Sequence, residues 1–196
     1  MTNQQRWTWD RKNPSGWQLD SEEVLSRGYY FGEILSRKAH RGSQSINFNI
    51  IDTKDFVQCL AVTKDNNLVL VSQFRPGNKG LTLEVPGGTV EPGEHPIVAA
   101  ERELREESGY TGDKPILLWS GFGNPALGTA HAFYYLIRNC QKTHDTCFDP
   151  TEDLATYLLP VNQLDNALDD DTFCHAMTVT GLLLFQRWLH RNHAEG

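Results

Sequence analysis

Residues 87–110, which read GGTVEPGEHPIVAAERELREESGY, decide the fold. The Gly and Pro residues of the first half predict a loop, because they supply backbone turns that other residues resist. Pro96 suits the first position of a helix, and residues 97–108 are rich in Ala, Leu, Glu and Arg, which favour helix. Gly109 is suited to the left-handed conformation that ends a helix. The stretch therefore predicts a loop followed by a helix over residues 97–108.

Three carboxylates gather on one face of this predicted helix. At about 100° per residue, Glu103, Glu106 and Glu107 point the same way, with Ala99 and Ala100 beside them. When partly desolvated, two such charges about 4 Å apart repel each other by about 4 kcal/mol at an effective dielectric of about 20. Clustered carboxylate oxygens suit a hard divalent cation, Mg²⁺ or Mn²⁺. The alternative is a solvated acidic helix, which the glutamates taken alone would favour.

The whole stretch resembles the Nudix box, G-x5-E-x7-R-E-U-x-E-E-x-G-U, in which U is an aliphatic residue. The fixed positions are occupied at the required spacing by Gly88, Glu94, Arg102, Glu103, Leu104, Glu106, Glu107 and Gly109. Tyr110 departs from the pattern in the final aliphatic position, which is a packing position. The resemblance identifies the chain as a Nudix hydrolase and implies an αβα sandwich. The mixture of strands and helices without regular β-α alternation agrees with this α+β class.

The resemblance also implies which residues hold the metal. Glu103 and Glu107 are the expected principal ligands, and Glu106 is a further ligand or the carboxylate that positions the attacking water. The carbonyl of Gly87 is an additional candidate ligand, because a small residue lets the backbone approach an ion closely. A pyrophosphate bridge carries charge that repels hydroxide, so its hydrolysis needs cations over the phosphates and an activated water.

Two arginines have both a structural and a phosphate-binding interpretation. Arg102 is expected to brace the loop against the helix together with Glu94, with phosphate contact as the alternative. Arg75 ends a predicted strand, where its guanidinium suits bidentate recognition of phosphate or pairing with a carboxylate. Glu84 precedes the Pro-Gly-Gly turn and is expected either to contact substrate or to brace an Arg.

Segments outside the box resemble those of ADP-ribose pyrophosphatases. These are QFRPG (73–77), LEVPGG (83–88), a Pro at 125 that lies sixteen residues beyond Gly109, and DPTEDL (149–154). The resemblance implies that the substrate is a nucleoside diphosphate sugar, with ADP-ribose cleaved to AMP and ribose 5-phosphate. Pro125 is the residue expected to accompany this preference. The alternatives are GDP-mannose or UDP-sugar hydrolysis, and a Nudix domain that binds such ligands without cleaving them.

The general base has two candidates. Glu152 matches the Glu of the family's mobile catalytic loop, where it binds or orients the attacking water. Some ADP-ribose enzymes carry another Glu two residues earlier, where this chain has Pro150. The base is therefore Glu152 or a glutamate of the box.

The remaining chain predicts strands on both sides of the box and a helix at the end. Two β-compatible runs, residues 29–39 and 43–51, predict an N-terminal antiparallel ribbon, whereas residues 1–28 show turn signals and polar residues. Further strands are expected at 57–63, 68–74, 81–85, 116–119, 131–137 and 155–159, and a closing helix at 171–190. The predicted organisation is residues 1–54 as a β-ribbon and dimerisation segment, and residues 55–196 as the Nudix hydrolase domain.

Composition limits the partners. A net charge of −7 argues against general affinity for nucleic acid or anionic membrane, so any phosphate substrate must meet local cations. No apolar run approaches the length of a membrane span, and the first residues lack a signal-peptide core, which together predict a cytoplasmic protein. The resemblance implies a homodimer. Cys59 lies in an apolar run and Cys174 in the predicted closing helix, so both are expected to be buried thiols.

Overall fold

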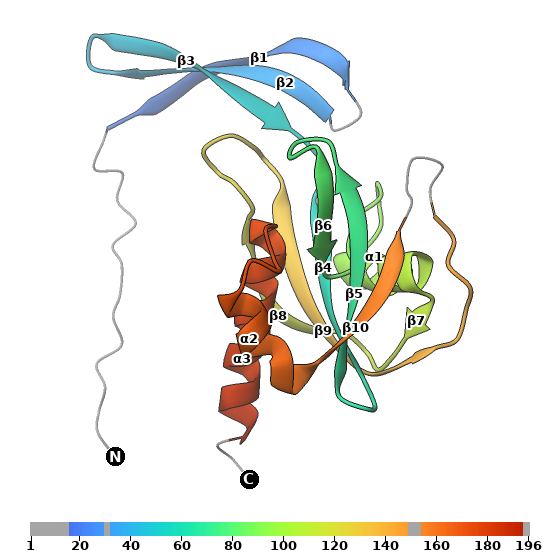
Figure 1. Cartoon of the computed structure of the whole chain (residues 1–196). Coiled ribbons are helices and arrows are strands. Elements are labelled where there is room, and N and C mark those ends of the chain that lie inside the picture. Colours follow the sequence, from blue (N-terminus) through green and yellow to red (C-terminus); the bar gives the residue numbers. More distant parts are fainter. Residues whose placement is uncertain (1–15, 30–31, 149–153, 194–196) are drawn as a thin grey trace, which may run out of the picture. The chain divides into compact units, whose positions relative to one another are not determined.

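The structure, a computed structural model, describes residues 16–29, 32–148 and 154–193. The chain divides into two compact units, residues 1–52 and residues 53–196 (Figure 1). None of the helices in the described ranges is both long enough and apolar enough to cross a membrane.

The smaller unit is a three-stranded antiparallel sheet in the order β1-β2-β3. The strands are β1 (Gln18–Tyr29), β2 (Gly32–Arg41) and β3 (Gln44–Asp52). The ribbon predicted from the sequence corresponds to β2 and β3, and β1 covers a segment for which no strand was predicted. β1 has no apolar alternation, and its pairing with β2 includes an ion pair between Glu22 and Arg37. Cross-strand pairing of this kind stabilises a strand without a hydrophobic pattern.

The larger unit is built on a seven-stranded mixed sheet in the order β10-β5-β4-β9-β7, with β6 paired to β5 and β8 to β9. Its strands are β4 (Phe56–Thr63), β5 (Asn67–Arg75), β6 (Gly80–Glu84), β7 (Tyr110–Thr111), β8 (Ile116–Phe122), β9 (His131–Lys142) and β10 (Ala155–Pro160). The neighbours β4 and β9 run parallel, and the other pairs are antiparallel. The central strand β4 is buried along almost its whole length, which fits its continuous apolar sequence.

Helices cover both faces of this sheet (Figure 1). They are α1 (Pro96–Ser108), the 3-10 turn η1 (Val161–Gln163), α2 (Leu164–Asp169) and α3 (Ala176–His193). On one face, Ala99, Ala100 and Leu104 of α1 pack against Val57, Cys59, Ala61 and Val69. On the other face, Leu182 and Phe185 of α3 pack against Leu60, Val62, Leu68 and Leu70. Successive residues of β4 thus enter opposite cores, and the predicted αβα sandwich is confirmed.

Two local predictions were wrong, and one short helix was missed. The closing helix starts at Ala176 rather than at 171, because the Asp170 side chain accepts a hydrogen bond from the Thr172 N–H at 2.9 Å and forms a local turn. Cys174 therefore precedes α3 and is exposed, whereas Cys59 is buried as predicted. The short α2 was not predicted, since six residues are too few to show a helical period.

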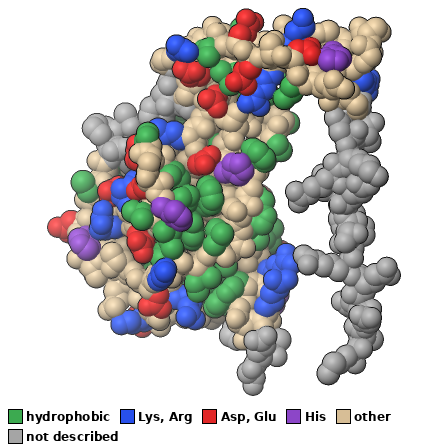
Figure 2. All heavy atoms as spheres, turned by 180° about the vertical axis from the view of Figure 1, so that it is seen from behind, with side chains coloured by type: hydrophobic (Ala, Val, Ile, Leu, Met, Phe, Trp, Pro, Cys, Tyr) green, Lys and Arg blue, Asp and Glu red, His purple; other side chains and the backbone are tan. Residues whose placement is uncertain are grey.

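Large hydrophobic side chains remain exposed on β8 and in the loop after it, at Ile116, Leu117, Trp119, Phe122 and Leu127. Figure 2 shows hydrophobic side chains gathered on one face of the larger unit, among acidic, basic and His side chains. An apolar area of this kind is common where proteins bind ligands or partners.

Candidate active site

Helix α1 begins and ends as the sequence predicts. His95 is the N-cap, with its Nδ1 accepting a hydrogen bond from the Ile97 N–H at 3.3 Å, and Pro96 occupies the first helical position. Gly109 ends the helix in the left-handed conformation, at φ 75°, and its N–H donates to the Arg105 carbonyl at 2.8 Å. A Cβ on Gly109 would lie 2.2 Å from the His144 carbonyl oxygen, so the next loop also requires glycine here.

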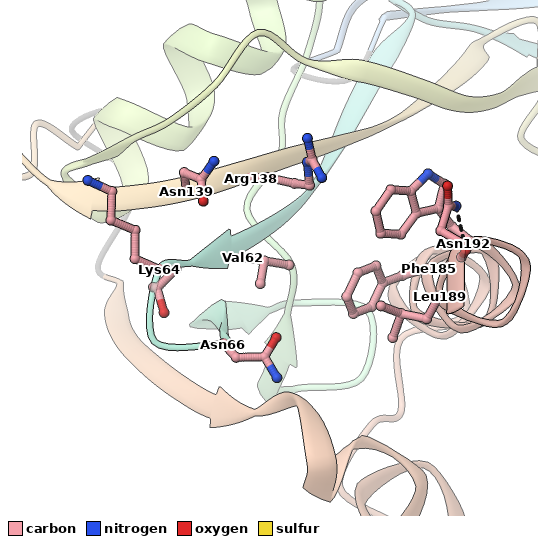
Figure 3. Close-up of a pocket in the computed structure, with 10 residues that line it drawn as sticks. Val62, Lys64, Asn66, Arg138, Asn139, Phe185, Leu189 and Asn192 are labelled. Carbon is pink, nitrogen blue, oxygen red and sulfur yellow. Dashed lines mark hydrogen bonds between the residues drawn. The ribbon is translucent and has the colours of Figure 1, made fainter. Parts of the chain in front are cut away.

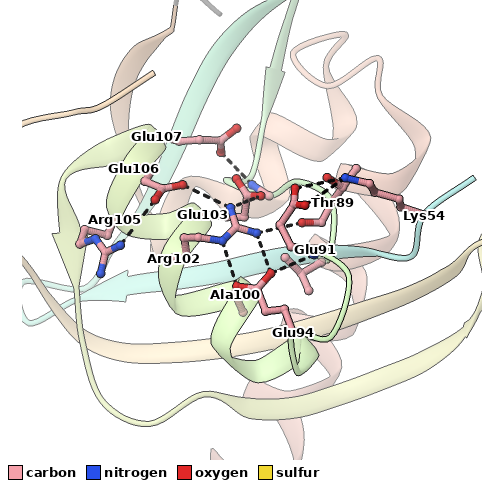
Figure 4. A network of polar contacts seen from close by, with 12 residues as sticks. Lys54, Thr89, Glu91, Glu94, Ala100, Arg102, Glu103, Arg105, Glu106 and Glu107 are labelled. Atoms are coloured by element: carbon pink, nitrogen blue, oxygen red, sulfur yellow. Dashed lines mark hydrogen bonds and ion pairs between the residues drawn. The ribbon is translucent and has the colours of Figure 1, made fainter. Parts of the chain in front are cut away.

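Arg102 is the centre of the polar network on this helix (Figure 4). Its Nε and Nη2 donate to the two carboxylate oxygens of Glu94, both at 2.9 Å, and Nη2 also donates to the Thr89 carbonyl at 2.9 Å. Its Nη1 donates to Glu103 at 2.8 Å and to Glu106 at 3.2 Å. The hydrogen bonds from Arg102 lower the pKa of Glu94 below its ordinary value. The prediction that Arg102 and Glu94 brace the loop against the helix is confirmed.

Glu107 is held by the backbone of the glycine loop. Its carboxylate is buried, with 4% of the residue exposed, and accepts a hydrogen bond from the Gly87 N–H at 2.8 Å. The carbonyls on either side of Gly87, those of Pro86 and Gly88, accept hydrogen bonds from β4 at 2.7 and 2.9 Å. Because successive peptide groups of an extended chain face opposite ways, we expect the Gly87 carbonyl on the same side as its N–H.

Other atoms approach both glycines closely. A Cβ on Gly87 would lie 2.2 Å from the Val57 carbonyl oxygen, and a Cβ on Gly88 would lie 2.4 Å from the Glu103 Oε1. Real Cβ atoms do not approach other atoms so closely, so no other residue fits without displacing β4 or the Glu103 carboxylate. The Gly-Gly pair therefore brings Glu103 and Glu107 against the loop.

The chemistry of these donors fits a hard divalent cation. Three carboxylates and a backbone carbonyl are oxygen ligands, which Mg²⁺ and Mn²⁺ prefer. Within the described ranges, no three His, Cys, Asp or Glu residues already form a metal-binding arrangement, and Arg102 contacts both Glu103 and Glu106. Burial and the neighbouring charges of Glu107 and Glu103 raise the pKa of the Cys59 thiol, which excludes this sulfur as a ready thiolate ligand.

Arg75 of β5 forms an ion pair with Glu84 of β6, whose carboxylate is buried. Arg75 Nε and Nη2 donate to the two oxygens of Glu84 at 2.7 and 2.8 Å, and Glu84 is only 2% exposed. His175 Nδ1 lies 3.0 Å from the same carboxylate. Burial opposes ionisation of Glu84, but the hydrogen bonds from Arg75, His175 and Thr82 outweigh it and lower its pKa to about 2. Of the two interpretations, the contacts show Glu84 bracing Arg75, whose side chain is still 41% exposed.

Three comparisons with known proteins place these features in a family. The model of the NUDIX domain matches residues 54–178. The chain belongs to the NUDIX family. Among its relatives, the ADP-ribose pyrophosphatase of Bacillus subtilis is 30% identical over 124 residues, which cover 63% of this chain and 57% of that protein. The chain therefore spans little more than half the length of this relative.

A second NUDIX relative, the ADP compounds hydrolase NudE of Escherichia coli, is 27% identical over 176 residues, 87% of this chain and 91% of that protein. A solved structure, the crystal structure of an ADP compounds hydrolase, has a TM-score of 0.80 and covers 92% of this chain and 98% of its own, at 21% identity. At so low a sequence identity, the structural likeness is evidence of a shared fold alone. The resemblance to Nudix hydrolases of the ADP-ribose pyrophosphatase type is confirmed.

Of the two remaining predicted site residues, the structure describes only Pro125. Pro125 is exposed in the loop between β8 and β9, where the Asn124 carbonyl accepts a hydrogen bond from the Gly128 N–H at 2.8 Å. Asp55 joins the base of this loop to the NUDIX box, because its side chain accepts from the His131 N–H at 2.8 Å and its carbonyl from the Val90 N–H at 2.8 Å. Glu152 lies outside the described residues.

Sequence reasoning missed His175 as a member of the Glu84 cluster. It precedes α3, far along the chain from Glu84 on β6, and no local pattern marks it as a partner of that carboxylate. The sequence holds only a weak signal for this contact between His175 and Glu84. A buried carboxylate needs cationic or N–H partners, but the sequence does not say which of the seven His supplies one.

Proposed function

We propose that this NUDIX protein is a divalent-metal-dependent hydrolase of the pyrophosphate bond in nucleoside diphosphate sugars. The single observation that carries the proposal is the acidic face of α1, where Glu107 is buried against the Gly87 N–H and Glu103 is packed against Gly88. Burying carboxylates beside one another is costly unless a cation neutralises them. Arg102 and Arg105 do not balance the group, because Arg102 also pairs with Glu94 and Arg105 contacts only Glu106 among these carboxylates. The relatives named as ADP-ribose and ADP-compound hydrolases support the reaction class.

The proposed roles follow from the contacts. Glu103, Glu106, Glu107 and the Gly87 carbonyl would hold Mg²⁺ or Mn²⁺. Such an ion supplies positive charge over the pyrophosphate, which offsets the repulsion met by an attacking water. Arg102 keeps the carboxylates of Glu103 and Glu106 oriented, and the Gly87 N–H does the same for Glu107.

The metal assignment is tested by chelation and by one pair of variants. Activity should disappear with EDTA and return with Mg²⁺ or Mn²⁺. Glu107→Gln should keep the fold and lower kcat by about 10²- to 10⁴-fold, because a neutral amide binds a divalent cation poorly. Glu101→Gln, on the exposed side of the same helix, is the matched control and should retain activity. Full activity in a chelated sample would refute the metal assignment.

We propose ADP-ribose as the preferred substrate, with AMP and ribose 5-phosphate as products. The support is Pro125 in the loop that Asp55 ties to the box, together with the names of the relatives. Arg75 is the proposed phosphate contact, held in place by Glu84. A panel of ADP-ribose, GDP-mannose, UDP-glucose, diadenosine polyphosphates and dATP should give the highest kcat/KM for ADP-ribose. A higher value for another sugar nucleotide would refute the substrate, and binding without turnover would indicate a sensor.

Glu152 is proposed to position or deprotonate the attacking water, and a box glutamate is the alternative base. Glu152→Gln should lower kcat by about 10²- to 10⁴-fold with little change in KM, as expected when a general base is lost. The Mg²⁺ concentration for half-maximal activity should change less than in Glu107→Gln. A wild-type kcat in Glu152→Gln would assign the water to a box glutamate, with Glu106 as the first to replace.

We also propose that residues 1–54 form a dimerisation segment of a cytoplasmic homodimer. The support is the set of large apolar side chains that the strands of the smaller sheet leave exposed, Leu19, Val24, Leu25, Ile46, Phe48 and Ile51. Light scattering on the intact chain should give twice the mass of the 22.2 kDa monomer. Replacing Ile46 and Phe48 with Ser should yield the monomer, and an unchanged mass would exclude these side chains from the interface.

A further inference from the structure

A cavity of about 290 Å³ lies between α3 and the turn that joins β4 to β5 (Figure 3). Its lining residues are Val62, Thr63, Lys64, Asn66, Arg138, Asn139, Phe185, Trp188, Leu189 and Asn192. The cavity is at the end of β4 remote from the NUDIX box, because the first half of β4 pairs with the glycine loop through Val57 and Cys59. From Val57 to Thr63 an extended strand spans about 20 Å. The cavity also faces α3, whereas the box faces α1.

The cavity has an apolar wall and a cationic rim. Phe185, Trp188 and Leu189 of α3 form the wall together with Val62 of β4. Lys64 and Arg138 are exposed at the rim, and none of the described lining residues is acidic. The charged side chains among the lining residues are thus both positive, on a chain whose net charge is −7.

A β-bulge in β9 places two of its residues at the rim of the cavity. Ala61 pairs with Ile137 and Thr63 with Cys140, so two residues of β9, Arg138 and Asn139, oppose one residue of β4. Asn139 adopts a left-handed conformation, at φ 55°. Bulges redirect side chains, and here both residues of the bulge line the cavity.

Hydrogen bonds fix the surroundings of the cavity. The Asn66 carbonyl accepts from the Val161 N–H at 3.0 Å, which ties the β4–β5 turn to η1. Asn139 Nδ2 donates to Asp113 at 2.6 Å, and Asn192 Nδ2 donates to the Trp188 carbonyl at 2.7 Å. The Arg138 guanidinium lies 5.7 Å from the centre of the Trp188 ring, which places a cation beside the aromatic wall.

We propose that this cavity is a second ligand site, which takes a small aromatic anion. A ring would pack against Phe185 and Trp188, and its carboxylate or phosphate would lie toward Lys64 and Arg138. The end of α3 carries partial negative charge, so the anionic group belongs on the side of the sheet and not at the helix terminus. A cavity of about 150 Å³ holds benzene, so the volume here suffices for one ring with a charged substituent.

Benzoate is the probe, and benzamide is its neutral counterpart of nearly the same shape. Binding is followed by the shift of the Trp188 indole N–H in ¹H–¹⁵N spectra of the intact chain, assigned by its absence in Trp188→Phe. Benzoate should shift this resonance and should bind at least about fivefold more tightly than benzamide. Lys64→Gln and Arg138→Gln should each weaken benzoate binding by about two- to fivefold, the range measured for exposed ion pairs.

Lys79→Gln is the matched control, because Lys79 is an exposed lysine in the turn between β5 and β6, at the other end of β5. It should leave the benzoate affinity unchanged. The proposal is overturned if benzamide binds as tightly as benzoate, if Lys64→Gln and Arg138→Gln leave the benzoate affinity unchanged, or if benzoate fails to shift the Trp188 resonance. Glu107→Gln should bind benzoate normally, so this test is independent of the proposed hydrolysis.

Discussion

Replacing Glu84 with Gln should destabilise the larger unit by about 3 kcal/mol at pH 7, because the pKa of this carboxylate falls from 4.5 to about 2 on folding. The buried charge is satisfied by the Arg75 guanidinium and by a contact with His175, and a neutral amide keeps the shape but loses the ion pair with Arg75. Since the folded pKa lies below the unfolded one, the stabilisation is complete above pH 4.5. It is lost as the pH falls toward 2.

The assay is urea unfolding followed by the helical circular dichroism signal at about 222 nm, since every helix in the described ranges belongs to the larger unit. The free energy gap between wild type and Glu84→Gln should narrow as the pH falls from 4.5 toward 2. The control is Glu91→Gln, which removes an exposed pair with Lys54 and should cost at most about 1 kcal/mol. The assignment of the ion pair would be refuted if Glu84→Gln were as stable as Glu91→Gln. It would also be refuted if the difference in unfolding free energy between wild type and Glu84→Gln did not change with pH.

Two further predictions concern close packing. Gly88→Ala should lower kcat/KM for ADP-ribose by about 10²-fold, because the added Cβ displaces the Glu103 carboxylate. Gly77→Ala is the control and should leave kcat/KM unchanged, because a Cβ there meets nothing within 4 Å. Equal activity of the two variants would show that the position of Glu103 is unimportant. A thiol reagent should label the exposed Cys147 in the folded protein and reach Cys140 only on unfolding, since burial raises the pKa of Cys140 to about 12. Equal labelling rates for the two would contradict this burial.

The sequence predicts best where local chemistry decides the structure. Helix α1 was predicted to within one residue, because Pro96 and Gly109 act through backbone constraints that do not depend on the rest of the chain. The strands β4 and β5 were predicted from apolar runs, since strands buried on both faces need them. The site's acidic face follows from helical periodicity alone.

The sequence predicts the structure poorly where contacts between distant segments of the chain determine it. Strand β1 has no apolar alternation and forms because β2 offers it a pairing edge. Ala99 and Ala100 were expected beside the glutamates, yet both are fully buried against the sheet, because small residues let α1 approach it closely. His175 joins Glu84 through the fold alone. The cavity rim depends on the bulge at Asn139, which only the pairing of β4 with β9 reveals.

The parallel pairing of β4 with β9 has a consequence for the order in which the chain folds. It joins Phe56 to Ala132, so the loop to be closed contains the whole NUDIX box and α1. Contacts between distant residues carry a large entropic cost and form slowly, whereas the hairpins β1–β2 and β2–β3 are local. During synthesis the N-terminal sheet can form early, but the acidic helix waits for β9 to emerge before its sheet is complete. A ribosome-bound chain that stops short of β9 would therefore carry a paired N-terminal sheet and an incomplete NUDIX sheet beneath α1.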